Sequence, residues 1–245
     1  MLQLNPTRQY LSTFVKTDSH QTVEILGLAK LNFLVVDAEH APFDRNQLDR
    51  MMLAGRAAGI PVLVRIPDHS PAHIQSVLDM GAAGIVVPHV DSVEQAQEVI
   101  ACARFRGGKR GLSLSPRFAN YATVPRRDAL DQADRALILC QIESAAAVAV
   151  VDAIAALQDV HSLFIGRSDL SMSMGLDNAK DPAVTAAVQT IIDAGRHHGK
   201  TVTVAIGSGS EIAEYRALGA NCFVVGSDQS LLRQAAAGLR KHLDA

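Results

Sequence analysis

A histidine and two carboxylates directly follow a short apolar segment near the start of the chain. Residues 33–36 read Phe-Leu-Val-Val, and Asp37, Glu39 and His40 come next. Such a run is typical of a parallel strand covered on both faces, so the polar residues are expected at its carboxyl end, where ligands meet α/β folds. His40 is a candidate general base because imidazole titrates near neutrality, and Asp37 is close enough to orient it. The alternative is a loop acid pair beside a hydrogen-bonded histidine.

A second pair of carboxylates, Glu143 and Asp169, follows two later apolar segments. Two carboxylates without a cysteine ligand suit a hard divalent ion such as Mg²⁺ or Mn²⁺. Such an ion could hold the keto and carboxylate oxygens of a 2-oxo acid and stabilise an enolate beside the carbonyl. Either carboxylate could instead be structural, since Asp169 stands where it could cap a helix.

Arg65 ends a third apolar segment. Its charge would be buried there unless it met an anion or a developing negative charge. A salt bridge within the protein is the alternative interpretation.

The elements that must position these residues alternate regularly. About eight apolar segments are each followed by a helical pattern over 245 residues, which predicts a single (β/α)₈ barrel domain spanning 1–245. An open doubly wound sheet is the alternative, although no Gly-x-Gly-x-x-Gly follows the first strand. The expected strands are 11–15, 32–37, 61–66, 84–88, 136–141, 162–165, 200–206 and 222–225. The expected helices are 19–30, 45–58, 71–80, 92–103, 145–157, 182–198, 211–218 and 229–242.

Two other stretches are candidate binding segments. Residues 104–125 are rich in Gly, Arg and Ser and too long for an ordinary connector, which predicts an active-site lid or binding loop, or else a mobile basic loop. The glycine-containing segments Gly-Ser-Gly at 207–209 and Gly-Ser-Asp at 226–228 follow the last two strands, where many barrels bind phosphate. Turns also need glycine, and Asp228 would repel a phosphate.

Composition excludes several classes of partner. The net charge is −2 with no basic block, so nucleic acid is not expected. The three cysteines lack close spacing, which favours reduced thiols in the cytoplasm. We find neither a signal pattern nor an apolar run of membrane-spanning length, so we expect a soluble protein with no membrane partner.

At these residues the sequence resembles the HpcH/HpaI aldolase family of metal-dependent class II pyruvate aldolases, over nearly its whole length. The motifs that carry the resemblance are Val-Asp-Ala-Glu-His-Ala-Pro at 36–42, Val-Arg at 64–65, Leu-Asp-Met-Gly at 78–81, Val-Pro at 87–88, Arg-Gly at 110–111, Gln-Ile-Glu-Ser at 141–144, Phe-Ile-Gly-Arg-Ser-Asp-Leu-Ser at 164–171 and Val-Gly-Ser-Asp at 225–228.

The resemblance implies a barrel of the phosphoenolpyruvate/pyruvate type, assembled as a hexamer (a dimer of trimers) with the last helix exchanged between subunits. It implies reversible cleavage of a 4-hydroxy-2-oxo acid to pyruvate, or a related 2-oxo acid, and an aldehyde, with Mg²⁺, Mn²⁺ or Co²⁺ as cofactor.

The resemblance also assigns roles to residues. His40 would be the base, acting through metal-bound water, and Arg65 would steady the keto oxygen. Asp79 would support the histidine of a neighbouring subunit. The metal ligands would be Glu143 and Asp169, and the pyruvate-binding groups would be Gln141 and the backbone at Ser168.

Two residues depart from the family pattern. Arg167 stands where proline is usual, which adds a positive charge beside the site, and His89 stands where an apolar residue is more usual. Two other functions stay open. One is an acyl-CoA hydroxy-acid lyase with a basic groove from Arg104, Arg106, Lys109 and Arg110, and the other is a non-catalytic barrel that binds a metabolite.

Overall fold

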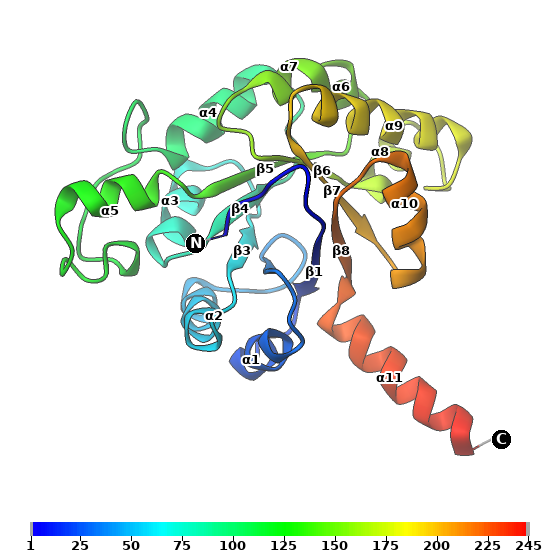
Figure 1. The fold of residues 1–245 in the computed structure, drawn as a ribbon, viewed down its shortest axis with the longest axis horizontal. Coiled ribbons are helices and arrows are strands. Elements are labelled where there is room, and N and C mark those ends of the chain that lie inside the picture. Colours follow the sequence, from blue (N-terminus) through cyan, green and yellow to red (C-terminus); the bar gives the residue numbers. More distant parts are fainter. Residues whose placement is uncertain (1, 244–245) are drawn as a thin grey trace.

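A computed structural model describes residues 2–243, in which eight parallel strands close into a barrel in the order β1 to β8 (Figure 1). This confirms the predicted (β/α)₈ fold. The strands are β1 (Tyr10–Val15), β2 (Leu34–Asp37), β3 (Val62–Arg65), β4 (Gly84–Val87), β5 (Leu137–Ile142), β6 (Ser162–Ile165), β7 (Thr201–Ile206) and β8 (Cys222–Ser227).

Helices surround the barrel and connect successive strands (Figure 1). They are α1 (His20–Leu28), α2 (Arg45–Ala58), α3 (Pro71–Asp79), α4 (Val93–Ala103), α5 (Arg126–Ala133), α6 (Ala145–Ala149), α7 (Val151–Ala156), α8 (Arg167–Ser173), α9 (Pro182–His197), α10 (Ile212–Leu218) and α11 (Asp228–Leu243), with the 3₁₀ turns η1 (Arg117–Ala119) and η2 (Gly209–Glu211). No helix of the described residues is long and apolar enough to cross a bilayer.

Local sequence explains where the helices begin and end. Asp44 caps α2 through a reciprocal capping box with Gln47, and Gly59 ends that helix in the left-handed conformation at φ +68°. Ser92 caps α4 in the same way that Ser70 caps α3, by accepting a backbone N–H three residues on. These caps fix where each helix leaves the strand before it.

The expected helix at 145–157 is two helices. The helix is interrupted at Val150, which lies between α6 and α7 with φ −119° and ψ 10°. Ala-rich sequence favours helix throughout this stretch, so propensity alone did not reveal the break. Three further elements, α5, α8 and η1, had no counterpart among the expected helices.

Side chains fill the interior of the barrel. Alternate residues of each strand point inward, and they form a cluster separate from the larger layer between strands and helices. The inner cluster contains Tyr10, Phe14, Phe33, Val35, Leu63, Val86, Leu137, Leu139, Phe164, Cys222 and Val224. The ring centroids of Phe14 and Phe164 in this cluster are 6.2 Å apart.

The last helix, α11, projects away from the barrel (Figure 1). Leu232 and Leu239 on this helix are 74% and 73% exposed. The helix therefore carries large apolar side chains that the barrel of its own chain does not cover.

Candidate active site

The alternation that fills the barrel interior also places side chains at its mouth, which is the opening at the carboxyl ends of the strands. Phe33, just before β2, and Val35 on β2 point inward and are followed by Asp37 at the next position of the same alternation, and on β3 Leu63 is followed by Arg65. Asp37 and Arg65 are register partners on the paired strands. The same step of two along β5 leads from the inward Leu137 and Leu139 to the buried side chains of Gln141 and Glu143. A charged cluster therefore lies on top of an apolar plug, at the carboxyl ends of the strands.

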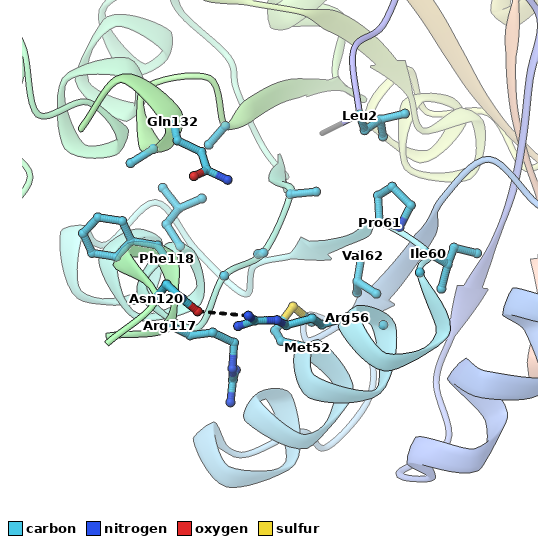
Figure 2. A pocket seen from close by; sticks show the side chains of 18 of the residues that line it. Leu2, Met52, Arg56, Ile60, Pro61, Val62, Arg117, Phe118, Asn120 and Gln132 are labelled. Atoms are coloured by element: carbon cyan, nitrogen blue, oxygen red, sulfur yellow. Dashed lines mark hydrogen bonds between the residues drawn. The ribbon is translucent and has the colours of Figure 1, made fainter. Parts of the chain in front are cut away.

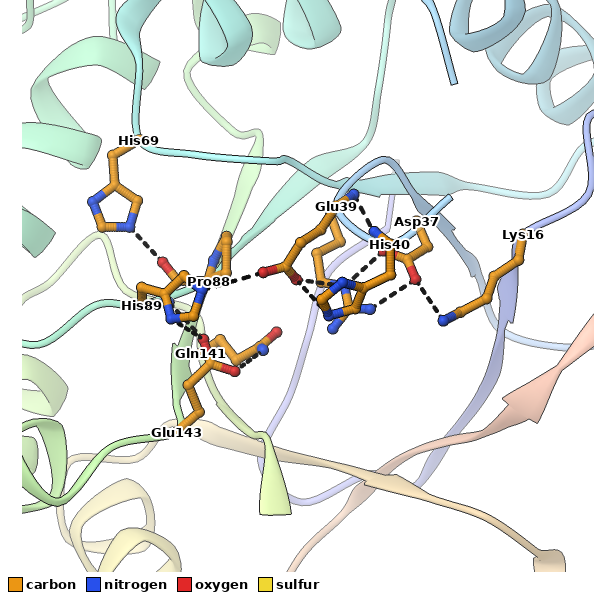
Figure 3. Close-up of polar contacts among 10 residues, drawn as sticks. Lys16, Asp37, Glu39, His40, His69, Pro88, His89, Gln141 and Glu143 are labelled. Carbon is orange, nitrogen blue, oxygen red and sulfur yellow. Dashed lines mark hydrogen bonds and ion pairs between the residues drawn. The ribbon is translucent and has the colours of Figure 1, made fainter. Parts of the chain in front are cut away.

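Asp37 and Arg65 form a buried bidentate ion pair. Arg65 donates from Nε to Asp37 Oδ1 at 2.9 Å and from Nη2 to Oδ2 at 2.7 Å. Lys16, at the end of β1, places Nζ 2.9 Å from the same Oδ2 (Figure 3). Burial alone would raise the pKa of Asp37, but the hydrogen bonds and charges of Arg65 and Lys16 outweigh it and lower the pKa to about 2. Asp37 is therefore a fixed anion at neutral pH.

Glu39 is the carboxylate beside the His40 ring. Glu39 Oε2 lies 3.6 Å from His40 Nε2 and 3.2 Å from Arg65 Nε, whereas Asp37 meets His40 only through the backbone N–H of that residue. Oε2 accepts no hydrogen bond from the described residues, because the Arg65 Nε–H is directed to Asp37. Burial raises the pKa of Glu39, and the Glu143 carboxylate adds to that increase. The His40 side chain is 53% exposed, so it faces the open side of the mouth.

Gln141 and Glu143 form a second buried polar group of the mouth. The Gln141 side-chain amide donates to Glu143 Oε2, and the backbone N–H of His89 donates to Glu143 Oε1 at 2.7 Å (Figure 3). Gln141 Oε1 has no partner among the described residues. A Cβ atom at Gly166 would lie 2.9 Å from Glu143 Oε2, so the glycine leaves room for this carboxylate.

Ser168 and Asp169 lie in the first turn of α8, directly after Gly166, and both are exposed. Gly166 packs against Glu143, so the first turn of α8 begins next to this carboxylate. The neighbouring Arg167 points elsewhere. It donates from Nη2 to Glu211 at 3.0 Å and stacks 4.7 Å from the Tyr215 ring centroid. Its charge is thus compensated within the chain.

Asp79 does not lie with the other candidates. It ends α3, close to the amino end of β4, where it accepts a 2.7 Å hydrogen bond from Arg110 Nη2. The Arg110 guanidinium lies over the neighbouring rings of Phe105 and Phe118, 4.4 Å and 4.8 Å from their centroids. Within one chain, Asp79 therefore supports the packing at the opposite end of the barrel.

The expectation of a lid at 104–125 is wrong for the chain's own mouth. This segment follows α4 and leads to α5 and β5, so it lies at the amino ends of the strands. There it borders a cavity of about 600 Å³ whose walls include Pro61, Val62 and Phe118 (Figure 2). The prediction was wrong because composition indicates a long loop but does not show which end of the barrel the loop covers.

The four cations of the proposed basic groove are all paired with carboxylates. Their partners are Asp159 for Arg104, Asp131 for Arg106, Glu98 for Lys109 and Asp79 for Arg110. The idea of phosphate binding after β7 and β8 has similarly little support. The backbone N–H groups of Gly207 and Ser208 donate to Glu211, and Asp228 accepts those of Lys16 and Thr17.

Asp152, His197 and His198 form a second group of candidate metal ligands on the outside of the barrel. Their ligand atoms lie within 4.8 Å of one another. His198 follows α9 shortly before β7 begins, so this group is separate from the mouth. It contains none of the residues that the sequence singled out.

Sequence reasoning missed two members of the mouth. Lys16 lies two positions beyond the inward Phe14 on β1, and this spacing was a usable signal. His89 was noted only as unusual. Its ring contacts both Glu39 and Glu143, and no local pattern predicts this because the contacts join three separate strand ends.

The fold and the mouth together define a class: a (β/α)₈ barrel with an acidic centre containing arginine and histidine at the carboxyl ends of its strands, where barrel enzymes have their active sites. Residues 11–235 match the model of the family described as HpcH/HpaI aldolase/citrate lyase. The chain belongs to this family.

Individual proteins show the same relationship. A 5-keto-4-deoxy-D-glucarate aldolase of Klebsiella pneumoniae subsp. pneumoniae is 38% identical over 217 residues, which cover 87% of this chain and 84% of that protein. The crystal structure of an HpcH/HpaI aldolase/citrate lyase family protein from Burkholderia cenocepacia J2315 has a TM-score of 0.92 at 29% identity, covering 97% of this chain and 95% of the other. Citrate synthase SbnG has a TM-score of 0.86 at 28% identity, covering 97% and 94%.

Proposed function

We propose that this protein is a divalent-metal-dependent aldolase. It would reversibly cleave a 4-hydroxy-2-oxo acid into pyruvate, or a related 2-oxo acid, and an aldehyde. The observation that carries the proposal is the mouth, where Arg65, Glu143 and Gln141 are buried beneath the exposed His40. Folding alone gives no reason to gather these groups at the carboxyl ends of the strands.

The residues at the mouth fit a divalent cation. Glu143 and Asp169 would hold it, since carboxylate oxygens are the ligands that Mg²⁺, Mn²⁺ and Co²⁺ accept. Gly166 supports this assignment because any larger residue would crowd Glu143 Oε2. The unpartnered Gln141 Oε1 supports it too, because a buried amide oxygen calls for a ligand or water. When bound, the cation would supply Lewis-acid stabilisation of charge on the keto oxygen.

The side chains of the mouth would then divide the reaction among them. His40 accepts the proton of the C4 hydroxyl, and the C3–C4 bond breaks so that its electron pair forms the enolate while C4 leaves as the aldehyde. Arg65 provides positive charge near the enolate oxygen, through the guanidinium edge opposite Asp37. Glu39 orients the His40 ring, and a proton returned to C3 completes the 2-oxo acid.

The relatives named 5-keto-4-deoxy-D-glucarate aldolases favour a substrate derived from a sugar acid. The acyl-CoA alternative has less support, since the cations that would bind the nucleotide are already paired. A barrel that binds a metabolite without turnover has no observation in its favour. The cytoplasm is the compartment we propose, because all three cysteines are buried free thiols.

We also propose that the chain works as a homo-oligomer, a hexamer built as a dimer of trimers, with α11 exchanged between subunits. The exposed leucines of the projecting α11 support an exchange, because a second copy would cover them. Asp79 supports it as well. It could reach a catalytic histidine only across a subunit boundary, since it lies at the other end of its own barrel.

The test is deuterium exchange into the methyl group of pyruvate, which requires no knowledge of the aldehyde. After chelation, the protein should catalyse exchange only when Mn²⁺ or another divalent ion is restored. Glu143→Ala and Asp169→Ala should abolish exchange while circular dichroism and thermal unfolding stay close to wild type. Full exchange in either variant would contradict the assignment of Glu143 and Asp169 as metal ligands. Absence of exchange with every divalent ion would leave a bulkier 2-oxo acid donor as the next substrate to try.

A further inference from the structure

His89 lies between two carboxylates of the mouth. Its Nδ1 atom is 3.1 Å from Glu143 Oε1, and its Nε2 atom is 3.4 Å from Glu39 Oε1 (Figure 3). The backbone of His89 is in the left-handed region at φ +52°, which non-glycine residues seldom adopt outside constrained sites. Its backbone N–H anchors the same Glu143 oxygen at 2.7 Å. Both the backbone N–H and the ring of His89 therefore contact the same oxygen of Glu143.

The ring contacts match a recurring arrangement at metal centres. A histidine ligand commonly donates its second ring N–H to a carboxylate, which fixes the tautomer and the ring orientation. Glu39 Oε1 lies 3.4 Å from Nε2 and Glu143 Oε1 lies 3.1 Å from Nδ1, so with the ring proton on Nε2 the lone pair of Nδ1 lies beside the Glu143 oxygen. Two lone-pair atoms 3.1 Å apart repel unless a positive centre lies beside them. Two atoms bound to one cation at a right angle, each at about 2.1 Å, would be about 3 Å apart.

We propose that His89 Nδ1 is a third protein ligand of the cation held at Glu143, with Glu39 as the carboxylate that orients the ring. This inference rests on the proposed metal site and adds to it. Imidazole nitrogen favours Co²⁺, Ni²⁺ and Zn²⁺, whereas Mg²⁺ prefers oxygen ligands only. The added ligand makes this mouth selective for later transition ions over Mg²⁺.

Metal affinity tests the assignment without any turnover. Because Asp152, His197 and His198 could also bind Co²⁺, the titrations use a His197→Ala/His198→Ala background. Against that background, His89→Phe should weaken Co²⁺ binding by about 10- to 100-fold and change Mg²⁺ binding by less than about threefold. His73→Phe, which alters an exposed histidine paired with Asp68, should change neither affinity.

Pulsed electron paramagnetic resonance of the Mn²⁺-loaded protein gives a second readout. A ¹⁴N coupling from a directly bound imidazole is expected in the background protein and in His73→Phe, and it should disappear in His89→Phe. If the coupling persists in His89→Phe, or Co²⁺ affinity is unchanged, His89 is not a ligand. Glu143→Gln/Asp169→Asn serves as a separate arm. Unchanged metal binding in that variant would overturn the metal site itself and not the choice of His89 alone.

Discussion

At the residue scale, Asp37 has a different role from Glu39 and His40. Asp37 holds the positive charges of the mouth in place, whereas Glu39 and His40 are the groups that could transfer a proton. Both Asp37 oxygens are already bound to Arg65, Lys16 or backbone N–H groups, so this residue is poorly suited to accept a proton during turnover. The sequence suggested that Asp37 orients His40. In the structure the neighbour of the His40 ring is Glu39. Asp37 fixes Arg65 instead, and Arg65 in turn contacts Glu39.

This arrangement makes stability depend on pH. The pKa of Asp37 is lowered from 3.8 to about 2 in the folded state, so its contribution is fully present above about pH 4 and is lost as pH falls through about 2. The difference corresponds to about 2 kcal/mol. Asp37→Asn removes this term at pH 7 and leaves the buried charge of Arg65 with only the Glu39 carboxylate, 3.2 Å away, so we expect a loss of about 3 kcal/mol.

Urea unfolding followed at pH 7, 4, 3 and 2.5 measures this prediction. The gap in unfolding free energy between wild type and Asp37→Asn should narrow as pH falls below 4, because the unfolded wild-type chain takes up a proton at Asp37 before the folded protein does. A gap that stays constant down to pH 2.5 would contradict the assignment of the Asp37–Arg65 ion pair as the source of the pH-dependent stability.

At the scale of elements, strands were predicted well and short helices poorly. Most strands are short, largely apolar runs that are buried, so β6 was predicted at its observed bounds, and α2 was predicted from its caps. α5 and α8 have few buried residues to set a period, so their sequences resembled loops. The site followed from the strands: residues just beyond strand ends were found, and contacts between separate ends, such as those of His89, were not.

The junction between β6 and α8 gives a second prediction. Gly166→Ala places a Cβ 2.9 Å from Glu143 Oε2 and 3.0 Å from Glu143 Cβ, so the carboxylate must shift. We expect metal affinity to fall by roughly tenfold, about 1.4 kcal/mol, because the ligand loses its position. Isothermal titration with Mn²⁺ measures this effect. Gly209→Ala, where a Cβ would meet nothing within 4 Å, is the matched control and should bind as wild type does. Equal losses in both variants would mean that crowding of Glu143 is not the cause.

At the scale of the whole molecule, the two ends of the barrel have different tasks. The carboxyl end gathers the charged mouth, while the amino end holds the 104–125 segment, its ion pairs and the cavity beside Phe118. The barrel fold by itself does not determine the oligomeric state. Family resemblance suggested the hexamer, and the projecting α11 and the position of Asp79 at the amino end of the barrel support it.

If α11 packs on a neighbouring copy, charges on its apolar face should weaken the assembly. We expect Leu232→Glu/Leu239→Glu to lower the mass measured by size-exclusion light scattering and to reduce activity at low protein concentration, since oligomers obey mass action. Leu112→Glu, a similar change at an exposed leucine of the 104–125 segment, is the control. An unchanged mass for the α11 variant would rule out its leucines as an interface.

The filled barrel has a kinetic consequence. Because Phe14, Phe164 and their neighbours close the interior beneath the mouth, both products must leave through one opening. The 2-oxo acid half would lie deeper, next to Gln141 and Glu143, and the aldehyde half nearer the exposed His40. Release should therefore be ordered, with the aldehyde leaving first. In steady-state cleavage assays the 2-oxo acid should inhibit competitively against the hydroxy acid and the aldehyde noncompetitively. The reverse pattern would place the two halves the other way round.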